Sequence, residues 1–185
     1  MENPKFRPSA KIIHTIGDHI IKDVYAAVAE LVKNSYDADA KKGFVEFRDF
    51  VDPTKAKIII RDDGCGMSRE NVLNRWLIPG TNNKAETRKS LNGREMQGRK
   101  GIGRFAASIL GNEFILKTTD SEKNTTIIQL DWKEFNSKKF LDEIDIFRIF
   151  YDKLPIQYKS KTEGRLNHTL LQWTYLFNQK LNFYV

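Results

Sequence analysis

A helix that carries a polar stripe is the feature of this sequence that most restricts its fold. In residues 20–40, apolar side chains recur three and four positions apart, which predicts an α-helix rather than a strand. On such a helix, Glu30, Asn34 and Asp37 fall within roughly 60° of one another at about 100° per residue. A helix packed against a core buries polar groups at a cost unless they have partners. The stripe therefore indicates either a solvated face or the wall of a pocket.

A strand that ends in acidic residues and glycines is the second informative segment. Residues 58–60 are isoleucines, which predict a buried strand, and Asp62, Gly64, Gly66 and Met67 follow at its end. A carboxylate there can accept a hydrogen bond from an amino group, and glycines permit the close approach of a ligand. A tight turn that begins with Asp would have the same composition. Taken alone, the segment leaves both interpretations open.

A glycine-rich run, residues 98–104, leads into a short apolar helix predicted for residues 105–110. Free backbone N–H groups and the positive end of a helix dipole make such a run suitable for phosphate. The chain has no G-x-x-x-x-G-K-[ST] pattern and no G-x-G-x-x-G after a strand with a suitable acidic residue downstream, so neither a P-loop nor a Rossmann site is supported. Residues 81–100 are polar and predict a long loop, of the kind that often forms a lid.

The order of the predicted elements indicates an α+β fold. Helices are expected early in the chain and most strands late, which favours a two-layer α/β sandwich whose helices cover one face of a mixed sheet. The length of 185 residues fits one domain. The predicted strands are residues 44–47, 58–60, 114–118, 126–132, 146–150 and 169–175.

Composition and charge narrow the class of protein. The single cysteine, Cys65, cannot form an internal disulfide, and no group of Cys and His has metal-ligand spacing, which argues against structural zinc. No apolar stretch approaches the roughly 18 residues of a spanning helix, so we expect a cytoplasmic protein without a membrane partner. The net charge of +7 favours acidic partners, namely nucleotide phosphates, nucleic acid or anionic surfaces.

Taken together, the three segments resemble the GHKL superfamily of ATPases, which have the Bergerat fold. Residues 30–38 match its E-L-x-x-N-x-x-D-A box, residues 62–66 its D-x-G-x-G box, and residues 98–103 its G-x-x-G-x-G lid box. Gyrase B subunits, ninety-kilodalton heat-shock chaperones, MutL-type repair proteins and histidine-kinase catalytic domains belong to this superfamily. Residues 76–84 and 98–105 are most similar to bacterial relatives of the microrchidia and MutL branches. The resemblance implies one ATP-binding domain over residues 1–185, the N-terminal part of a longer protein.

The resemblance also implies a role for each candidate residue. Glu30 would be catalytic, as the general base or water-orienting group for attack on the γ-phosphate, and Asn34 would ligate Mg²⁺. Asp62 would accept a hydrogen bond from the adenine amino group, with Gly66 allowing the base to approach. Backbone N–H groups near Gly101 and Gly103 would contact the phosphates. The other candidates for nucleotide binding are Asp37, Gly64, Met67, Thr81, Lys84, Gly98, Lys100, Ile102 and Thr169.

Several of these candidates have alternatives. Asp37 is expected to fix the helix against the strands rather than to contact the nucleotide. Thr169 is similar to the threonine of the family's G-T strand beside adenine, although His168 stands where glycine is usual. Thr126 is the alternative for that role.

The implied function is Mg-dependent ATP hydrolysis, with lid closure coupled to formation of a homodimer and slow turnover. Histidine-kinase catalytic domains usually lack a glutamate at the position of Glu30, and no phosphoacceptor segment precedes it here, so hydrolysis is favoured over phosphotransfer. A nucleotide-gated switch module with little hydrolysis stays open as an alternative. Superfamily members often take a catalytic lysine from a following domain, so we expect the isolated segment to be weakly active.

Overall fold

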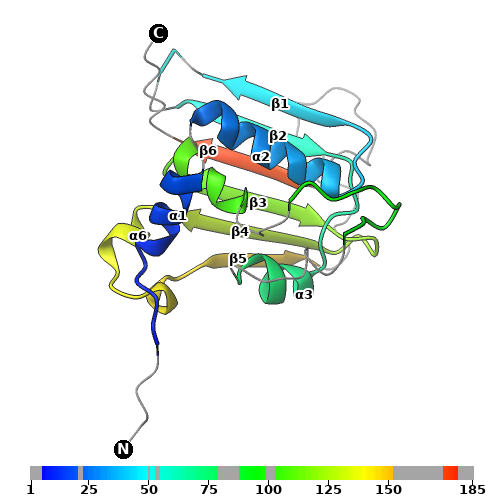
Figure 1. Cartoon of the computed structure of the whole chain (residues 1–185). Helices are drawn as coiled ribbons and strands as arrows, with labels where there is room; N and C mark the ends of the chain where they lie inside the picture. Colours follow the sequence, from blue (N-terminus) through cyan, green and yellow to red (C-terminus); the bar gives the residue numbers. More distant parts are fainter. Residues whose placement is uncertain are drawn as a thin grey trace, which may run out of the picture.

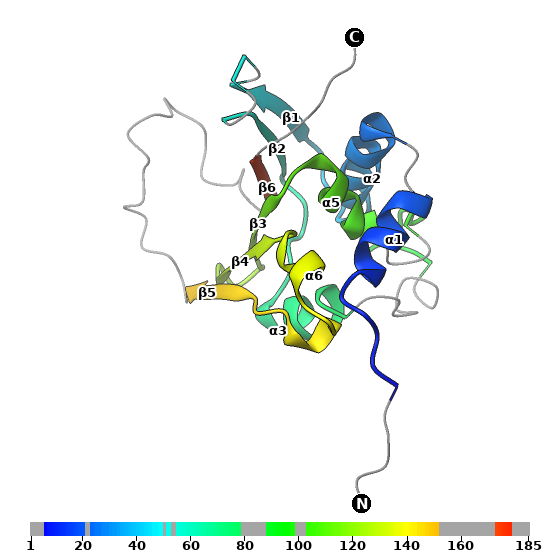
Figure 2. The same cartoon turned by 90° about the vertical axis from the view of Figure 1, so that its left-hand side faces the viewer.

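Six strands form one sheet in the computed structural model of the chain, and helices cover one face of that sheet (Figure 1; Figure 2). This arrangement confirms the predicted two-layer α/β sandwich. The structure describes residues 6–20, 23–49, 51–52, 55–78, 88–98, 103–151 and 173–178, and of residues 17–20, 151 and 173–178 it describes the backbone only.

The strands follow the apolar segments of the sequence. Their order across the sheet is β1-β2-β6-β3-β4-β5. Their bounds are β1 Gly43–Arg48, β2 Lys57–Asp62, β3 Glu113–Thr119, β4 Thr125–Asp131, β5 Phe147–Tyr151 and β6 Trp173–Asn178. The last strand was predicted at residues 169–175, so it begins later than expected, and Thr169 lies outside the described residues.

The pairing of the strands differs from the predicted mixed sheet, because every pair among the described strands is antiparallel. Strands β1 and β2 reverse direction through a short connection, and so do β3 and β4. Strand β6 lies between β2 and β3 and runs opposite to both. Strands β2 and β3 therefore point the same way without being neighbours, which is why no parallel pair forms between them.

The helix predicted for residues 20–40 is α2 Val24–Asp37, which begins later and ends earlier than predicted. Another helix, α1 Ile12–Ile20, precedes α2 in the chain. The side chain of Asp23 accepts a hydrogen bond from the Ala26 N–H at 2.8 Å and caps the start of α2. The remaining helical segments are short. They are α3 Arg69–Asn71, the π-helix η1 Val72–Trp76, the 3₁₀ helix η2 Gly103–Ala106, α5 Ala107–Leu110, α6 Glu134–Ser137 and the 3₁₀ helix η3 Leu141–Glu143. No helix in the described ranges is long and apolar enough to cross a membrane.

The core lies between the helical layer and the sheet. Helix α2 contributes Leu31, and β2 and β3 contribute Ile58, Ile60 and Leu116, all of them fully buried. Burying one such side chain contributes about 1.5–3 kcal/mol relative to leaving it exposed. Helix α2 also packs on η2 and α5, the segment that follows the glycine run. This packing fixes the polar stripe of α2 relative to the end of β2 and to the start of η2.

Candidate nucleotide-binding site

Glu30 lies beside the end of the glycine run. A Cβ atom added at Gly103 would lie 3.1 Å from Glu30 Oε2, so the carboxylate and the start of η2 are in close proximity. The other carboxylate oxygen, Oε1, accepts from Lys33 Nζ at 2.6 Å. Glu30 and Asn34 are both half-buried on α2. The structure thus brings the first and third sequence boxes together.

Asp62, at the end of β2, is the most deeply buried acidic group of the candidate site, with 1% of its surface exposed. Its Oδ1 accepts from the Gly64 N–H at 2.9 Å, whereas Oδ2 is buried and has no hydrogen-bond partner among the described residues. Burial raises the pKa of Asp62, and the nearby Ser35 hydroxyl and the Gly64 N–H oppose the increase. A buried carboxylate oxygen of this kind can accept a hydrogen bond from an amino group of a ligand.

The glycines after Asp62 are required by the packing of the chain itself. A Cβ atom at Gly64 would lie 2.6 Å from the carbonyl oxygen of Ala38, at the end of α2. Gly66 has a φ of +66°, and a Cβ there would collide with the Thr119 carbonyl oxygen. The sequence predicted that these glycines leave room for a ligand. On the side where a Cβ atom would project, however, protein backbone fills that room. The approach of a base to another side of Gly66 stays a prediction.

Gly66→Ala is therefore expected to destabilise the fold by about 2–3 kcal/mol, because it combines a left-handed backbone with a backbone collision. Gly43→Ala is the matched control, since no heavy atom lies within 4 Å of the position that its Cβ would occupy. We expect the control to change stability by less than about 0.5 kcal/mol. Denaturant unfolding of both variants measures the difference, and a Gly66→Ala variant as stable as the parent would contradict the packing described.

A buried threonine that the sequence analysis did not single out holds the next residue. The Met67 N–H donates to Thr118 Oγ1 at 2.8 Å, and Thr118 is fully buried on β3. Thr126 is also buried and lies opposite Thr118 on β4. The alternation of β3, with Phe114 and Leu116 facing the core, places Thr118 on the same face. This alternation is visible in the sequence and could have identified Thr118 as a residue that faces the core.

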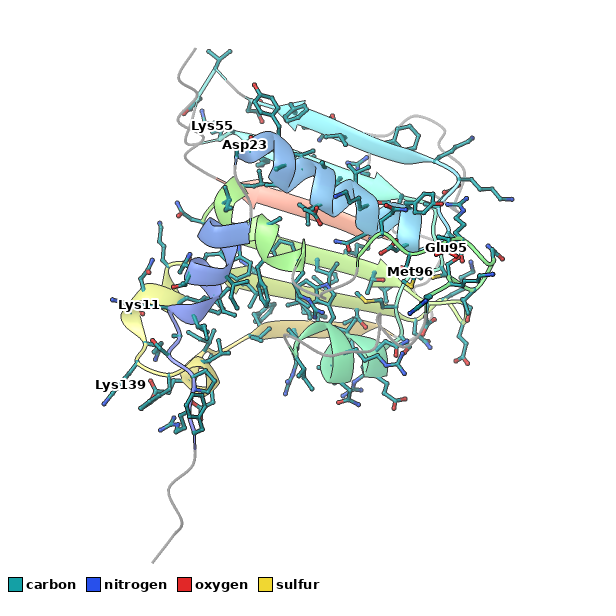
Figure 3. All side chains as sticks on the ribbon, in the orientation of Figure 1. Lys11, Asp23, Lys55, Glu95, Met96 and Lys139 are labelled. Carbon is teal, nitrogen blue, oxygen red and sulfur yellow. The ribbon has the colours of Figure 1, made fainter. Side chains whose placement is uncertain are left out.

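Asp37 connects α2 to the glycine run. Its carboxylate oxygens accept from the Gln97 N–H at 2.7 Å and from the Gly98 N–H at 3.0 Å. The sequence assigned Asp37 to helix–strand packing, but these bonds go to the segment that leads into the glycine run, because this side chain lies in the last turn of α2. Figure 3 shows Met96 and Glu95 of that segment at the end of α2 opposite to Asp23.

Arg104 holds the other end of the glycine run in place. Its Nη1 donates to the carbonyl oxygens of Arg75, at 2.9 Å, and of Trp76, and its guanidinium lies 5.7 Å from the centroid of the Trp76 ring. These contacts join the start of η2 to the end of η1. No pattern in the sequence predicted this role for Arg104. Six predicted site residues lie outside the described residues, and their roles stay predictions: Thr81, Lys84, Lys100, Gly101, Ile102 and Thr169.

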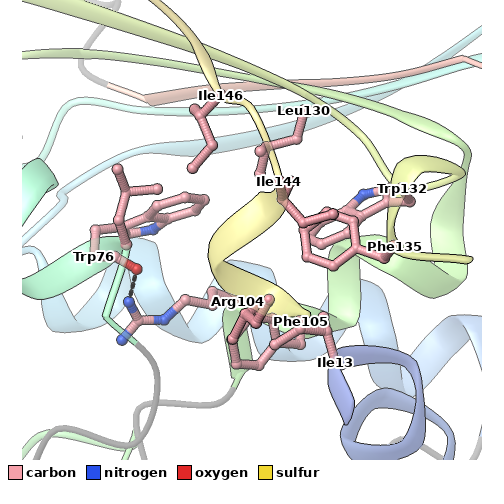
Figure 4. Close-up of a pocket in the computed structure, with 11 residues that line it drawn as sticks. Ile13, Trp76, Arg104, Phe105, Leu130, Trp132, Phe135, Ile144 and Ile146 are labelled. Carbon is pink, nitrogen blue, oxygen red and sulfur yellow. Dashed lines mark hydrogen bonds between the residues drawn. The ribbon is translucent and has the colours of Figure 1, made fainter. Parts of the chain in front are cut away.

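An apolar cavity of about 100 Å³ lies between α1, η1, η2 and the segment after β4, and Arg104 lines part of it (Figure 4). Trp76, Trp132 and Phe135 are among its lining residues, and neither Glu30 nor Asp62 is. Within the described part of the chain, no three or more His, Cys, Asp or Glu side chains are grouped so as to hold a metal ion. The predicted Mg²⁺ ligand, Asn34, is a single amide. It fits Mg²⁺ if the phosphates of a nucleotide supply most of the other ligands.

Comparison with known proteins agrees with this geometry. A family model described as “Histidine kinase-, DNA gyrase B-, and HSP90-like ATPase” matches residues 22–178. The chain is 28% identical over 104 residues to “Putative type II restriction enzyme HgiDII” of Herpetosiphon aurantiacus, a match covering 56% of this chain and 16% of the relative. It is 46% identical over 48 residues to “ATPase morc-1” of Caenorhabditis elegans, covering 26% of this chain and 5% of the relative. The matched region is thus a small part of either relative.

The residues matched by the family model include all three candidate segments of the site. The helix with Glu30 and Asn34, the strand end with Asp62 and the glycine run with Gly98 and Gly103 all lie between residues 22 and 178. The family model extends over most of the chain and over all six strands. The chain belongs to the family of histidine kinase-, DNA gyrase B- and HSP90-like ATPases.

Proposed function

We propose that this chain binds ATP with Mg²⁺ and hydrolyses it. The observation that carries the proposal is the Oδ2 atom of Asp62, a buried acceptor without a partner among the described residues, at a strand end beside α2. Leaving such a group unpaired costs about 1–3 kcal/mol, and more when it is charged. A ligand that donates from an amino group, as adenine does, would remove that cost. The family match supports the identification of the ligand as ATP.

The residues of the chain take separate roles in this proposal. Asp62 orients the adenine through its buried oxygen, and Glu30 accepts the proton of the attacking water through its carboxylate. Lys33, 2.6 Å from Glu30 Oε1, holds that carboxylate in place. Asn34 would hold Mg²⁺, and the ion would supply positive charge against the negative charge that develops during phosphoryl transfer. The start of η2 at Gly103 presents backbone N–H groups toward the phosphates.

Titration calorimetry with Mg-ATP and an assay of phosphate release test the function directly. We expect saturable binding to one site and slow release of phosphate, because lid closure and assembly rather than chemistry often limit the rate. Failure of the folded protein to bind Mg-ATP would reject the proposal. Binding without release would support the alternative, a nucleotide-gated switch module, or would show that a catalytic group from another part of the whole protein is needed.

We further propose that ATP binding promotes formation of a homodimer. Sedimentation velocity should show a dimer with Mg²⁺ and a non-hydrolysable ATP analogue, and a monomer with ADP or without nucleotide. Asp62→Asn, whose affinity for the analogue should be about 100-fold lower, should stay monomeric at an analogue concentration that just saturates the parent. A sedimentation coefficient that is the same with the analogue, with ADP and without nucleotide would contradict coupling between nucleotide and assembly.

Nucleic acid is the second candidate partner. The net charge of +7 and the restriction-enzyme name of one relative both support it for the whole protein. Binding of duplex DNA that weakens steeply as salt is raised would agree with this proposal, since phosphate contacts release counterions. An affinity too weak to measure at low salt would argue against it.

A further inference from the structure

The residue that follows α2 has a side chain at a position where glycine is favoured. The Ala38 N–H closes the helix onto the Asn34 carbonyl oxygen at 3.0 Å, and the next residue, Asp39, has a φ of +62°. Glycine most often takes this left-handed conformation after a helix, because a side chain there costs about 1–3 kcal/mol. The contacts of the Asp39 side chain offset that cost.

The Asp39 carboxylate is buried against the segment of residues 88–98, with 8% of the residue exposed. Its Oδ1 accepts from Ser90 Oγ at 2.5 Å, and its Oδ2 accepts from the Asn92 N–H at 3.0 Å. These donors lie in a turn that the Gly93 N–H closes onto the Ser90 carbonyl oxygen at 3.0 Å. The hydrogen bond from Ser90 holds the pKa of Asp39 below its ordinary value, so the acceptor is ionised near neutral pH.

Arg94 completes the contact between this segment and the helix end. Its Nη1 donates to the carbonyl oxygen of Ala40 at 2.8 Å and to that of Tyr36 at 3.4 Å. Its Nε lies 3.8 Å from Asp39 Oδ1, and its backbone N–H donates to Ser90 Oγ at 2.9 Å. The helix end and the segment therefore share one network of charged groups and hydrogen bonds.

The same segment runs directly into the glycine run. A bridge between Lys89 and Glu95 folds residues 88–96 into a small hairpin, and Gly98 follows after one residue. The Gly98 N–H donates a hydrogen bond to the carboxylate of Asp37, which lies two positions before Asp39 at the same end of α2. Helix α2, which carries Asn34, thus holds both the hairpin and the first glycine of the run.

We propose that Asp39 is a positioning residue for the phosphate side of the nucleotide site: by holding the hairpin on α2, it fixes where the glycine run begins relative to Asn34. This inference rests on the proposed function. The adenine side, at Asp62, lies on a different element and does not depend on the hairpin. Loss of the Asp39 carboxylate should therefore weaken the binding of ATP and leave the binding of a nucleoside unchanged.

Asp39→Asn is the variant that tests the inference. Asparagine tolerates the left-handed conformation as aspartate does, so the change removes the charge and one acceptor without straining the backbone. Asp49→Asn is the matched control, because Asp49 also has a positive φ, of +56°, and is exposed. By calorimetry, Asp39→Asn should lose about tenfold in affinity for Mg-ATP, the value of one charged hydrogen bond. Its affinity for adenosine, and both affinities of Asp49→Asn, should change less than about twofold.

Amide hydrogen exchange without nucleotide gives an independent measurement. The amides of Gln97 and Gly98 should exchange faster in Asp39→Asn than in the parent and the control, because the hairpin that precedes them is released. Equal losses for Mg-ATP and adenosine, an unchanged Mg-ATP affinity, or unchanged exchange at Gln97 and Gly98 would overturn the inference. If Asp39→Asn fails to fold, the same measurements on Ser90→Ala test the inference. This variant removes one hydrogen-bond donor to Asp39 that lies outside α2. A parent that does not bind Mg-ATP would reject the proposed function and with it the role in nucleotide binding, while the exchange data would still show whether Asp39 holds the segment.

Discussion

Asp62→Asn is expected to weaken the binding of Mg-ATP about 100-fold while the protein stays folded. The Oδ2 atom of Asp62 is buried and has no partner among the described residues, so it is the acceptor available to an adenine amino group. An amide NH₂ at that position would face the amino group with a second donor, and the hydrogen bond would be lost. Titration calorimetry measures the loss, and circular dichroism checks that the fold is intact.

The same variant should be at least as stable as the parent at neutral pH. Burial raises the pKa of Asp62 in the folded state, so ionisation of this group opposes folding at pH values above its ordinary pKa of 3.8. The penalty is absent at low pH, where both states are protonated, and grows as pH rises. We therefore expect the melting temperature of Asp62→Asn, relative to the parent, to be higher at pH 7 than at pH 4.

Asp63→Asn is the control, because Asp63 is next to Asp62 in the chain and its pKa is shifted in the opposite direction. Asp63 Oδ1 accepts from the N–H groups of Lys42 and Lys41, at 2.8 Å and 2.7 Å, and these bonds lower its pKa. Its contribution to stability is present at neutral pH and is lost as pH falls through its lowered folded-state pKa. Asp63→Asn should thus lose stability at pH 7 and keep its affinity for Mg-ATP. Equal ATP affinities for Asp62→Asn and the parent would remove Asp62 from the site.

Glu30→Gln is expected to lower the rate of ATP hydrolysis by about 10²–10⁴-fold, the usual contribution of a positioned general base. Binding should change by less than about threefold, since the amide keeps the shape of the side chain and one oxygen that can accept from Lys33. Single-turnover phosphate release measures the chemical step, and calorimetry measures binding.

Glu46→Gln provides the comparison for this substitution. Glu46 forms an ion pair with Arg48 on β1, with 43% of its side chain exposed, and lies on a different element from the candidate site. A surface pair of this kind contributes little to stability, so we expect hydrolysis and binding equal to those of the parent. If Glu30→Gln hydrolyses ATP at the parent's rate, another group activates the water and the catalytic assignment of Glu30 is wrong.

Features that depend on neighbours along the chain could be predicted from the amino-acid sequence. The helical spacing of Glu30, Asn34 and Asp37 placed them on one stripe, and the structure has them on α2. Ser68, a residue type favoured at helix starts, caps α3 by accepting from the Asn71 N–H. Each of these features is set by bonds within one or two helical turns or by strand alternation, so the local sequence contains the necessary information.

The contacts between segments that are distant in the chain could be read from the three-dimensional structure alone. It placed β6 between β2 and β3, made the sheet antiparallel throughout the described strands, and filled the Cβ side of Gly66 with the Thr119 carbonyl group. It also paired Asp39 with Ser90, 51 residues away in the chain. The local sequence around an acidic residue at a helix end is the same whether its side chain faces solvent or contacts a loop. Its partner is selected by the packing of the whole chain, which no local pattern records.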